Sequence, residues 1–313
     1  MAIAILLVLL GLPLLTYAAD QLVLGSARTA RKTGVSAVTV GILVIGLGTS
    51  APELLVSGSA AAGGQSALAV ANLVGSNVVN LTLILGLSGI LAPVLVRSSV
   101  LRREAPLSVG AVAVFGILLL TGLGVVAGLI LTVLLAASLF WMLRTAHSQP
   151  VDVLAAETEE FLDASSGHRT HIEIIRAALG LVGTLAGAQL LVEGGVDLAT
   201  RFGLSQQFIG FTLVAFGTSL PELVTSLQAQ RRGEADLLVG NLLGSNLINS
   251  LAGGAIVAFA SPSVPTPTAV PVATVMIGVS ALAWALLTRG HRLTRPEATA
   301  LTGIYLLALP LFI

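Results

Sequence analysis

Cysteine and charge are what the sequence lacks. The 313-residue chain contains no cysteine, so the sequence is silent about its redox compartment. Only 10% of the residues are charged and 55% are apolar, whereas a soluble domain carries roughly 25% charged residues. Too few polar side chains are present to cover a water-facing surface, so the outer surface must face lipid. The formal net charge of +0 argues against a polyanionic partner such as a nucleic acid.

Ten apolar runs are long enough to cross a bilayer, whose core of about 30 Å requires roughly 20 apolar residues per helix. They lie near residues 2–19, 36–62, 67–92, 105–121, 125–143, 171–193, 205–230, 237–260, 269–288 and 297–313. Backbone polar groups in lipid must be paired within the segment. We therefore expect an all-α membrane protein with ten transmembrane helices. No basic region precedes the first run, so we interpret it as a retained span and not as a signal peptide.

The distribution of lysine and arginine predicts the orientation. Fourteen of the fifteen fall in loops on one side of the ten spans, and Arg201 is the exception. The positive-inside rule assigns that side to the cytoplasm, which places both termini outside it. The polar segment 145–170 then becomes a cytoplasmic linker with several carboxylates. It lacks turn glycines at the spacing of a Ca²⁺ loop, which favours a solvated connector over a regulatory cation site.

An internal repeat relates the two halves of the chain. Residues 41–80 align without a gap with residues 210–249, with 18 identities in 40 positions. Each half contains five expected spans, so the second copy starts from the opposite face of the membrane. Inverted repeats of this kind are common in secondary transporters. We therefore expect a first five-helix repeat at 1–144, the acidic linker at 145–170 and an inverted five-helix repeat at 171–313.

The repeat contains the motif GTSAPE in its first copy and GTSLPE in its second. Proline removes one backbone N–H and clashes with the carbonyl four residues earlier, so each motif should free a carbonyl, that of Gly48 or Gly217. Glu53 and Glu222 end the two motifs near mid-span, where an unpaired charge costs several kcal/mol. Neither span offers a lysine or arginine to pair with them.

These groups together predict an all-oxygen cation site at the pseudo-twofold axis. The hydroxyl-bearing residues just before the prolines are Thr49, Ser50, Thr218 and Ser219. Hard cations such as Ca²⁺ and Na⁺ prefer carboxylate, carbonyl and hydroxyl oxygens. Histidine and cysteine are absent from both motifs, which disfavours a softer transition metal.

A second polar motif follows in each copy, with Asn72, Ser76, Asn77 and Asn80 in the first. Residues three, four and eight apart share one face of a helix. The residues that repeat this stripe are Asn241, Ser245, Asn246 and Asn249. Asn72, Asn77 and their counterparts either bind ions or act as small polar contacts between packed helices, and the sequence leaves both interpretations open.

The doubled GTS-x-PE and N-x-x-GSN-x-x-N blocks resemble the α-repeats of the cation/Ca²⁺ exchanger superfamily, specifically the prokaryotic Na⁺/Ca²⁺ exchangers. The resemblance covers both halves. It implies the family's ten-helix fold, an inner or plasma membrane location, and antiport of several Na⁺ for one Ca²⁺. The implied substrates are these two ions, with no cofactor and no protein partner. The resemblance also implies that the first and sixth helices slide against a core of eight.

Ligand roles follow from the resemblance alone. Glu53 and Glu222 would bind Ca²⁺, and Na⁺ in alternation, with oxygens from the neighbouring threonines and serines. The residues that would line the Na⁺ sites are Ser76, Ser245 and the carbonyls near Gly46 and Ala215. Asn80 and Asn249 would complete the central ring. Many relatives, including K⁺-dependent ones, have aspartate where this chain has Asn249, which disfavours K⁺ coupling.

Three alternatives stay open at this point. An H⁺- or K⁺-coupled cation/Ca²⁺ exchanger would use the same glutamates. A cation channel is disfavoured, because an inverted repeat within one chain indicates alternating access. An intramembrane enzyme is disfavoured, because all four histidines lie in or beside loops and provide no nucleophile–histidine pair.

Overall fold

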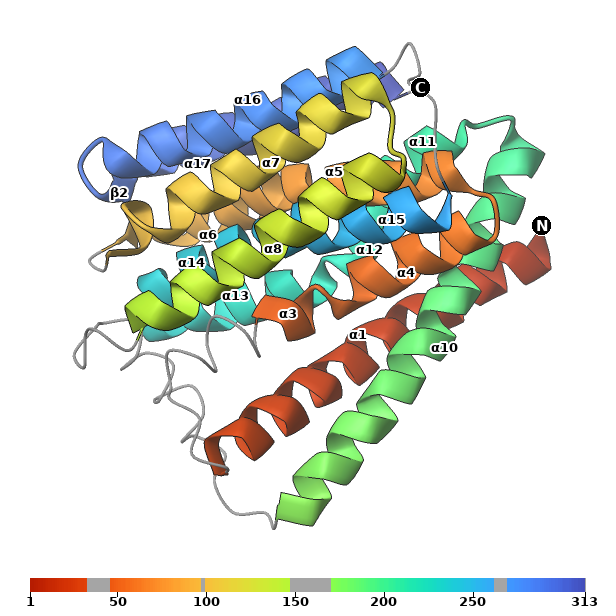
Figure 1. Ribbon diagram of the computed structural model, residues 1–313, viewed down its shortest axis with the longest axis horizontal. Helices are drawn as coiled ribbons and strands as arrows, with labels where there is room; N and C mark the ends of the chain where they lie inside the picture. Colours follow the sequence, from red (N-terminus) through yellow and green to blue (C-terminus); the bar gives the residue numbers. More distant parts are fainter. Residues whose placement is uncertain (33–45, 97–98, 147–169, 262–268, 313) are drawn as a thin grey trace.

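The computed structural model describes residues 1–32, 46–96, 99–146, 170–261 and 269–312. Nearly all of them are helical, which confirms the all-α prediction (Figure 1). One small antiparallel sheet is present in this part of the chain, in which β1 (Val94–Leu95) pairs with β2 (Arg292–Leu293). The predicted linker falls almost entirely at 147–169, outside the described residues.

The elements follow one another in the same order in both halves. Those of the first half are α1 (Ala2–Lys32), α3 (Gly46–Thr49), α4 (Ala51–Ala62), α5 (Ser66–Val79), η2 (Asn80–Ile84), α6 (Leu85–Leu91), η3 (Ser99–Leu101), α7 (Glu104–Thr121) and α8 (Val125–Ala146). Those of the second half are α10 (Thr170–Phe202), α11 (Gln206–Ile209), η4 (Gly210–Val214), α12 (Ala215–Thr218), α13 (Leu220–Arg232), α14 (Ala235–Ile248), η5 (Asn249–Gly253), α15 (Gly254–Ala260), α16 (Ala269–Thr288), α17 (Arg295–Ala308) and η6 (Leu309–Phe312).

The repeat found in the sequence is also present in the element boundaries. Helices α5 and α14 have the same length and begin 169 residues apart, at Ser66 and Ala235. The same offset relates α3 to α12, η2 to η5 and α6 to α15. In Figure 1, α5 precedes α6 from right to left, whereas α14 precedes α15 from left to right. The two copies therefore run in opposite directions through the molecule.

Seven helices in the described part of the chain are long and apolar enough to cross a membrane, or up to eight if the bent pair made by 206–218 and 220–232 counts as one span. The expected span at 36–62 begins in residues 33–45, which are not described. The expected span at 297–313 corresponds to α17, which has 14 residues and a length of about 21 Å, followed by the short turn η6. The prediction of ten transmembrane helices is therefore confirmed only in part.

Helices α5 and α14 form the centre of the protein. The apolar windows of the two spans that begin with them are 89% and 78% buried, whereas those of α1 and α10 are 33% and 28% buried. Many large apolar side chains are exposed on the outer helices, among them Leu9, Val126, Val182 and Leu307. A polar centre inside an apolar exterior is the arrangement expected of a protein surrounded by lipid.

Helices α1 and α10 lie side by side and cross the other helices at an angle (Figure 1). Their backbones touch at glycines. A Cβ atom on Gly187 would lie 2.6 Å from the backbone nitrogen of Leu15, and one on Gly25 would lie 2.6 Å from the carbonyl oxygen of Glu173. Small residues allow membrane helices to approach this closely.

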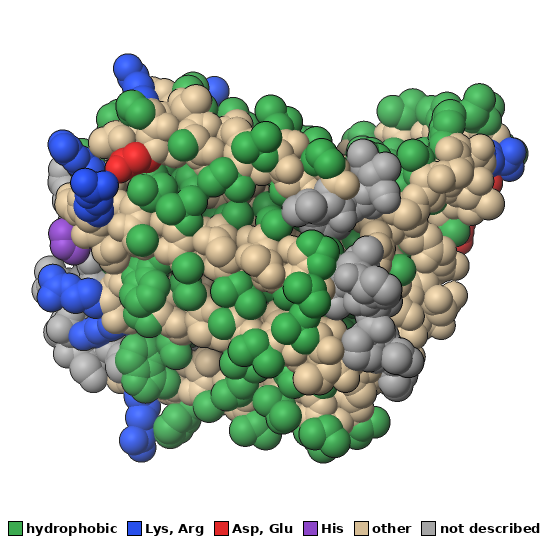
Figure 2. All heavy atoms as spheres, turned by 90° about the horizontal axis from the view of Figure 1, so that it is seen from above, with side chains coloured by type: hydrophobic (Ala, Val, Ile, Leu, Met, Phe, Trp, Pro, Cys, Tyr) green, Lys and Arg blue, Asp and Glu red, His purple; other side chains and the backbone are tan. Residues whose placement is uncertain are grey.

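Charge is concentrated at one end of the molecule. Figure 2 shows most of the visible basic side chains at the end where β2 lies, a smaller charged group at the opposite end, and hydrophobic side chains spread over the face between them. Both chain termini lie at the opposite end (Figure 1). The extracytoplasmic position of both termini, like the assignment of the arginine-rich end to the cytoplasm, remains a prediction from the positive-inside rule.

Candidate cation-binding site

Each GTS-x-PE motif interrupts a helix. In the first copy α3 ends at Thr49 and α4 begins at Ala51. In the second copy α12 ends at Thr218 and α13 begins at Leu220, with a bend of 42° between the two parts. Each proline sits in the first turn of the new helix, where its missing N–H leaves no intrahelical bond unmade. The motifs therefore break two spans in the middle, as the sequence predicts.

Glu53 and Glu222 lie in the first turn of α4 and α13, where the helix dipole favours a carboxylate. Both side chains are completely buried. Glu53 Oε1 accepts a hydrogen bond of 2.9 Å from Ser219 Oγ, which belongs to the other copy of the motif. Glu222 Oε1 accepts one of 3.1 Å from Ser245 Oγ. Among the described residues no salt bridge joins either carboxylate to a basic side chain.

The two threonines connect the copies through equivalent hydrogen bonds. Thr49 Oγ1 donates to Asn241 Oδ1 over 3.2 Å, and Thr218 Oγ1 donates to Asn72 Oδ1 over the same distance. Each broken span therefore contacts the asparagine stripe of the other half. These reciprocal hydrogen bonds explain why the motifs occur in pairs, because the polar cluster is formed by residues of both copies.

The two serines of the GSN blocks lie in the same cluster. Ser245 Oγ is 3.2 Å from Thr49 Oγ1, and Ser76 Oγ is 3.4 Å from Thr218 Oγ1. Both serines are fully buried. Each serine thus contacts a threonine of one motif, and Ser245 also contacts the Glu222 carboxylate directly.

Asn80 and Asn249 each begin a π-helical segment, η2 and η5. Such turns are rare and occur often at functional sites. Asn80 Nδ2 donates to Asn246 Oδ1 over 2.9 Å. Both polar side-chain atoms of Asn249 are buried without a hydrogen-bond partner among the described residues. The positions predicted to close the central ring are therefore marked by an irregular backbone in both halves.

The cluster contains an unusual number of buried oxygens that accept no hydrogen bond from the part of the chain that is described. They are Ser50 Oγ, Glu53 Oε2, Asn77 Oδ1, Asn80 Oδ1, Glu222 Oε2, Ser226 Oγ and Asn249 Oδ1. A buried polar atom without a partner costs about 1–3 kcal/mol. Carboxylate, amide and hydroxyl oxygens are the ligands that Ca²⁺ prefers. The described residues hold no group of three or more His, Cys, Asp or Glu side chains that could bind a metal, so the candidate ligands are these oxygens together with the two carboxylates.

The two backbone carbonyls of the prediction lie at equivalent places, because Gly46 begins α3 and Ala215 begins α12. The carbonyl oxygen of Ala215 accepts hydrogen bonds from the Ser219 N–H at 3.0 Å and from Thr218 Oγ1 at 3.2 Å. Since Thr218 has one hydroxyl hydrogen, its bonds to this carbonyl and to Asn72 Oδ1 are alternatives. The role of both carbonyls stays a prediction.

Three of the four asparagines left open by the sequence donate hydrogen bonds between helices, and the fourth, Asn241, accepts one from Thr49. Asn72 Nδ2 donates to Ser57 Oγ over 2.9 Å, and Asn77 Nδ2 donates to Ser250 Oγ over 2.9 Å. Asn246 Nδ2 donates to the carbonyl of Asn77 over 3.0 Å. These bonds support the packing interpretation, which a sequence spacing of three or four cannot separate from ion binding.

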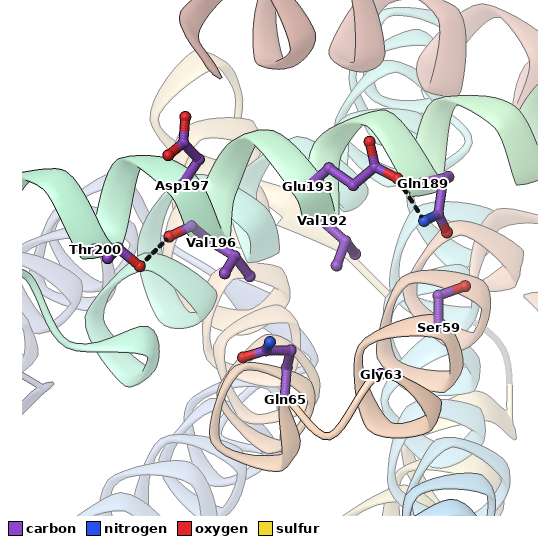
Figure 3. Close-up of a pocket in the computed structure, with 9 residues that line it drawn as sticks. All are labelled: Ser59, Gly63, Gln65, Gln189, Val192, Glu193, Val196, Asp197 and Thr200. Carbon is purple, nitrogen blue, oxygen red and sulfur yellow. Dashed lines mark hydrogen bonds between the residues drawn. The ribbon is translucent and has the colours of Figure 1, made fainter. Parts of the chain in front are cut away.

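A cavity that the sequence did not indicate lies between α10 and the turn from α4 to α5 (Figure 3). Its volume is about 440 Å³, and its lining residues are Ser59, Gly63, Gln65, Gln189, Val192, Glu193, Val196, Asp197 and Thr200. Gln189 Nε2 donates to Glu193 Oε1 over 2.8 Å. None of the twelve residues predicted for the cation site lines this cavity.

Comparison with known proteins agrees with the geometry. The chain matches the family model described as sodium/calcium exchanger protein over residues 3–144 and 173–313. It is 38% identical to a protein named as antiporter CaxA from Alkalimonas amylolytica, over 80% of this chain and 79% of that protein. It is 26% identical to the sodium/calcium exchanger MaX1 of Methanosarcina acetivorans, over 96% of this chain and 95% of that protein.

A solved structure of the sodium-calcium exchanger NCX_Mj, soaked with Na⁺ and Sr²⁺, has the same fold. It superposes with a TM-score of 0.71 at 30% identity, over 99% of this chain and 98% of that chain. The family resemblance predicted from the paired motifs is thereby confirmed. The relatives are exchangers and not enzymes, in line with the prediction. The chain belongs to the sodium/calcium exchanger protein family.

Proposed function

We propose that this protein is an antiporter that exchanges Na⁺ for Ca²⁺ across a prokaryotic inner or plasma membrane. The observation that carries the proposal is the pair of buried carboxylates, Glu53 and Glu222, each with one oxygen that has no hydrogen-bond partner among the described residues. They come from the two copies of the repeat and meet in one polar cluster. Both ions bind there in turn.

Charge makes the binding competitive. Two carboxylates in a membrane interior are strongly unfavourable without compensation, and one Ca²⁺ neutralises both. Two or more Na⁺ ions achieve the same balance at the same oxygens. Because both ion species need the same two carboxylates, the site cannot hold Ca²⁺ and a full set of Na⁺ at once. Binding of one ion species therefore displaces the other.

Alternating access is supported by the position of α1. This helix packs against α3, α4, α12 and α13, which are the four helix segments that contain the two motifs. A Cβ atom on Gly217 would collide with the side chain of Leu12 in α1. A shift of α1 together with α10 would therefore change which part of the motifs is covered. In this proposal the eight-span remainder holds the ions while the α1–α10 pair changes their access.

The experiment that tests the function is Ca²⁺ uptake into proteoliposomes that contain the purified protein. Uptake should be fast when Na⁺ is loaded inside and diluted outside, and should fall to the leak rate of empty liposomes when choline replaces Na⁺. Uptake driven by a proton gradient without Na⁺ would favour the H⁺-coupled alternative. A requirement for K⁺ together with Na⁺ would favour the K⁺-dependent one.

A further inference from the structure

Glu173, near the start of α10, is a buried carboxylate that the proposed ion site does not use. Its side chain is 1% exposed. Glu173 Oε1 lies 3.4 Å from Nη1 of Arg28 in α1, and Oε2 lies 3.6 Å from Nη1 of Arg176 one turn further along α10. Buried charges in proteins are paired, because an unpaired buried charge is costly. This ion pair joins two different helices, 145 residues apart in the chain.

Along the rest of the interface, glycines bring α1 and α10 into close contact. A Cβ added to Gly11, Gly25, Gly180, Gly187 or Gly194 would fall against the backbone or a Cβ atom of the partner helix. Van der Waals contacts of this kind are individually weak and non-directional. Between membrane helices there is also no hydrophobic driving force, since lipid is equally apolar. A directional contact is needed to fix one register, and the Arg28–Glu173 pair supplies it.

The pair is present at one end of the two helices only. At the offset of 169 residues, the counterparts of Glu173 and Arg28 are Ala4 and Asp197. Asp197 pairs instead with Arg201 within α10, at 2.7 Å, and both side chains are largely exposed. The ion pair thus breaks the twofold symmetry of the repeat, so the two ends of the α1–α10 pair are held with different strength.

We propose that the Arg28–Glu173 ion pair is a clasp that fixes the register of α1 on α10, so that the two helices move as one body. Both residues are positioning residues, because neither contacts the ion site. A buried carboxylate held by two guanidinium groups resists separation, since breaking the pair leaves an uncompensated charge. The inference rests on the proposed exchange function only for its effect on the transport rate.

The register is measured directly by spin labels, which the cysteine-free chain allows without background. Suitable sites are Leu6→Cys in α1 and Val182→Cys in α10, because both side chains face outward, with 54% and 63% exposure. With the native pair we expect one narrow distance. With Glu173→Gln we expect a broadened distribution containing a population displaced by up to one helical turn, about 5.4 Å. The control is Arg201→Gln, which should leave the narrow distance unchanged.

A second variant separates register from folding. Arg28→Gln/Glu173→Gln removes both charges of the pair, so neither an unpaired buried carboxylate nor an unpaired Arg28 is left, and the partly exposed Arg176 keeps access to water. We expect it to show the same broadened distances as Glu173→Gln, because the two residues act as one unit. A narrow native-like distance in this double variant would overturn the clasp.

Transport gives an independent readout. In proteoliposomes both variants should lower the maximal exchange rate about tenfold and leave the KM for Ca²⁺ and Na⁺ unchanged, because the ion ligands are untouched. A changed KM with an unchanged maximal rate would contradict a positioning role. The distance measurement tests the clasp whether or not Na⁺ drives Ca²⁺ uptake, so a failure of the proposed function is recognised separately.

Discussion

Replacing Glu53 or Glu222 by glutamine removes one charge from the ion site and keeps the shape of the side chain. Each carboxylate already accepts a hydroxyl hydrogen bond through Oε1, from Ser219 and Ser245. A glutamine Oε1 accepts the same bond, so we expect both variants to fold and to insert into the membrane. What each variant loses is the charge that balances a bound cation.

The magnitude follows from the charges of the ions. Two unit charges about 4 Å apart interact by about 4 kcal/mol at an effective dielectric constant of about 20. Loss of one carboxylate charge costs Na⁺ about this amount and Ca²⁺ about twice as much, because Ca²⁺ is divalent. The unloaded variant also has one buried charge fewer, which offsets part of both losses. Since each 1.4 kcal/mol is a factor of ten, we expect Ca²⁺ affinity to fall by at least about a hundredfold, and Na⁺ affinity by less.

The assay is Na⁺-driven Ca²⁺ uptake into proteoliposomes, together with Ca²⁺ binding to the detergent-purified protein. Insertion is checked from the amount of protein recovered in the liposomes. The matched control is Glu193→Gln in α10, an exposed glutamate whose carboxylate accepts a bond from Gln189, and it should retain uptake. Ca²⁺ uptake at the native rate in Glu53→Gln or Glu222→Gln would refute the assignment of these residues.

Three further predictions concern topology, coupling and packing. A reporter fused after Ile313 should lie outside the cytoplasm, and a reporter inserted near Asp152 should lie in the cytoplasm. If both reporters lie on the same side of the membrane, the number of spans between them is wrong. The rate of Na⁺-driven Ca²⁺ exchange should be the same in K⁺ and in choline. Asn249→Asp should change the competition of Na⁺ with Ca²⁺ more than it changes the affinity for Ca²⁺, because both glutamates that bind Ca²⁺ remain. A strong K⁺ requirement in the native protein would contradict this. Gly180→Ala should lower the free energy of unfolding by about 1–3 kcal/mol and lower the melting temperature, because the added Cβ would strike the backbone of Leu22. The control Gly278→Ala should not lower the melting temperature, because the space beside Gly278 is open. Equal melting temperatures would contradict the close contact.

The local breaks at the two motifs were predictable from the sequence because proline acts on its own helix. Pro52 and Pro221 affect only backbone groups within one turn, so the end of α3 and the start of α4 follow from a few neighbouring residues. The same holds for the repeat, which is written twice in the chain and reappears in the element boundaries at the same offset. Exposure to lipid also followed from the composition, because a chain with 10% charged residues has too few polar side chains to cover a surface in contact with water.

The hydrogen-bond partners inside the site were not predictable. A spacing of four residues places Asn72 and Ser76 on one helical face, but it does not say which helix that face meets. The structure pairs Thr49 with Asn241, 192 residues away, and Glu53 with Ser219, 166 residues away. Likewise, the π-helical turns at Asn80 and Asn249 have no separate signal in the residue types.

Sequence alone determined that this protein lies in a membrane, that its two halves repeat, and that two carboxylates sit where spans are broken. Each of these depends on composition or on interactions within a few residues along the chain. Only the tertiary structure decided which oxygens accept a hydrogen bond and which have no partner among the described residues, that α1 contacts both motifs, and that Arg28 reaches Glu173. Those contacts arise when distant helices pack against each other at glycine surfaces. The closeness of that packing depends on all the side chains between the helices at once, which no short stretch of sequence specifies.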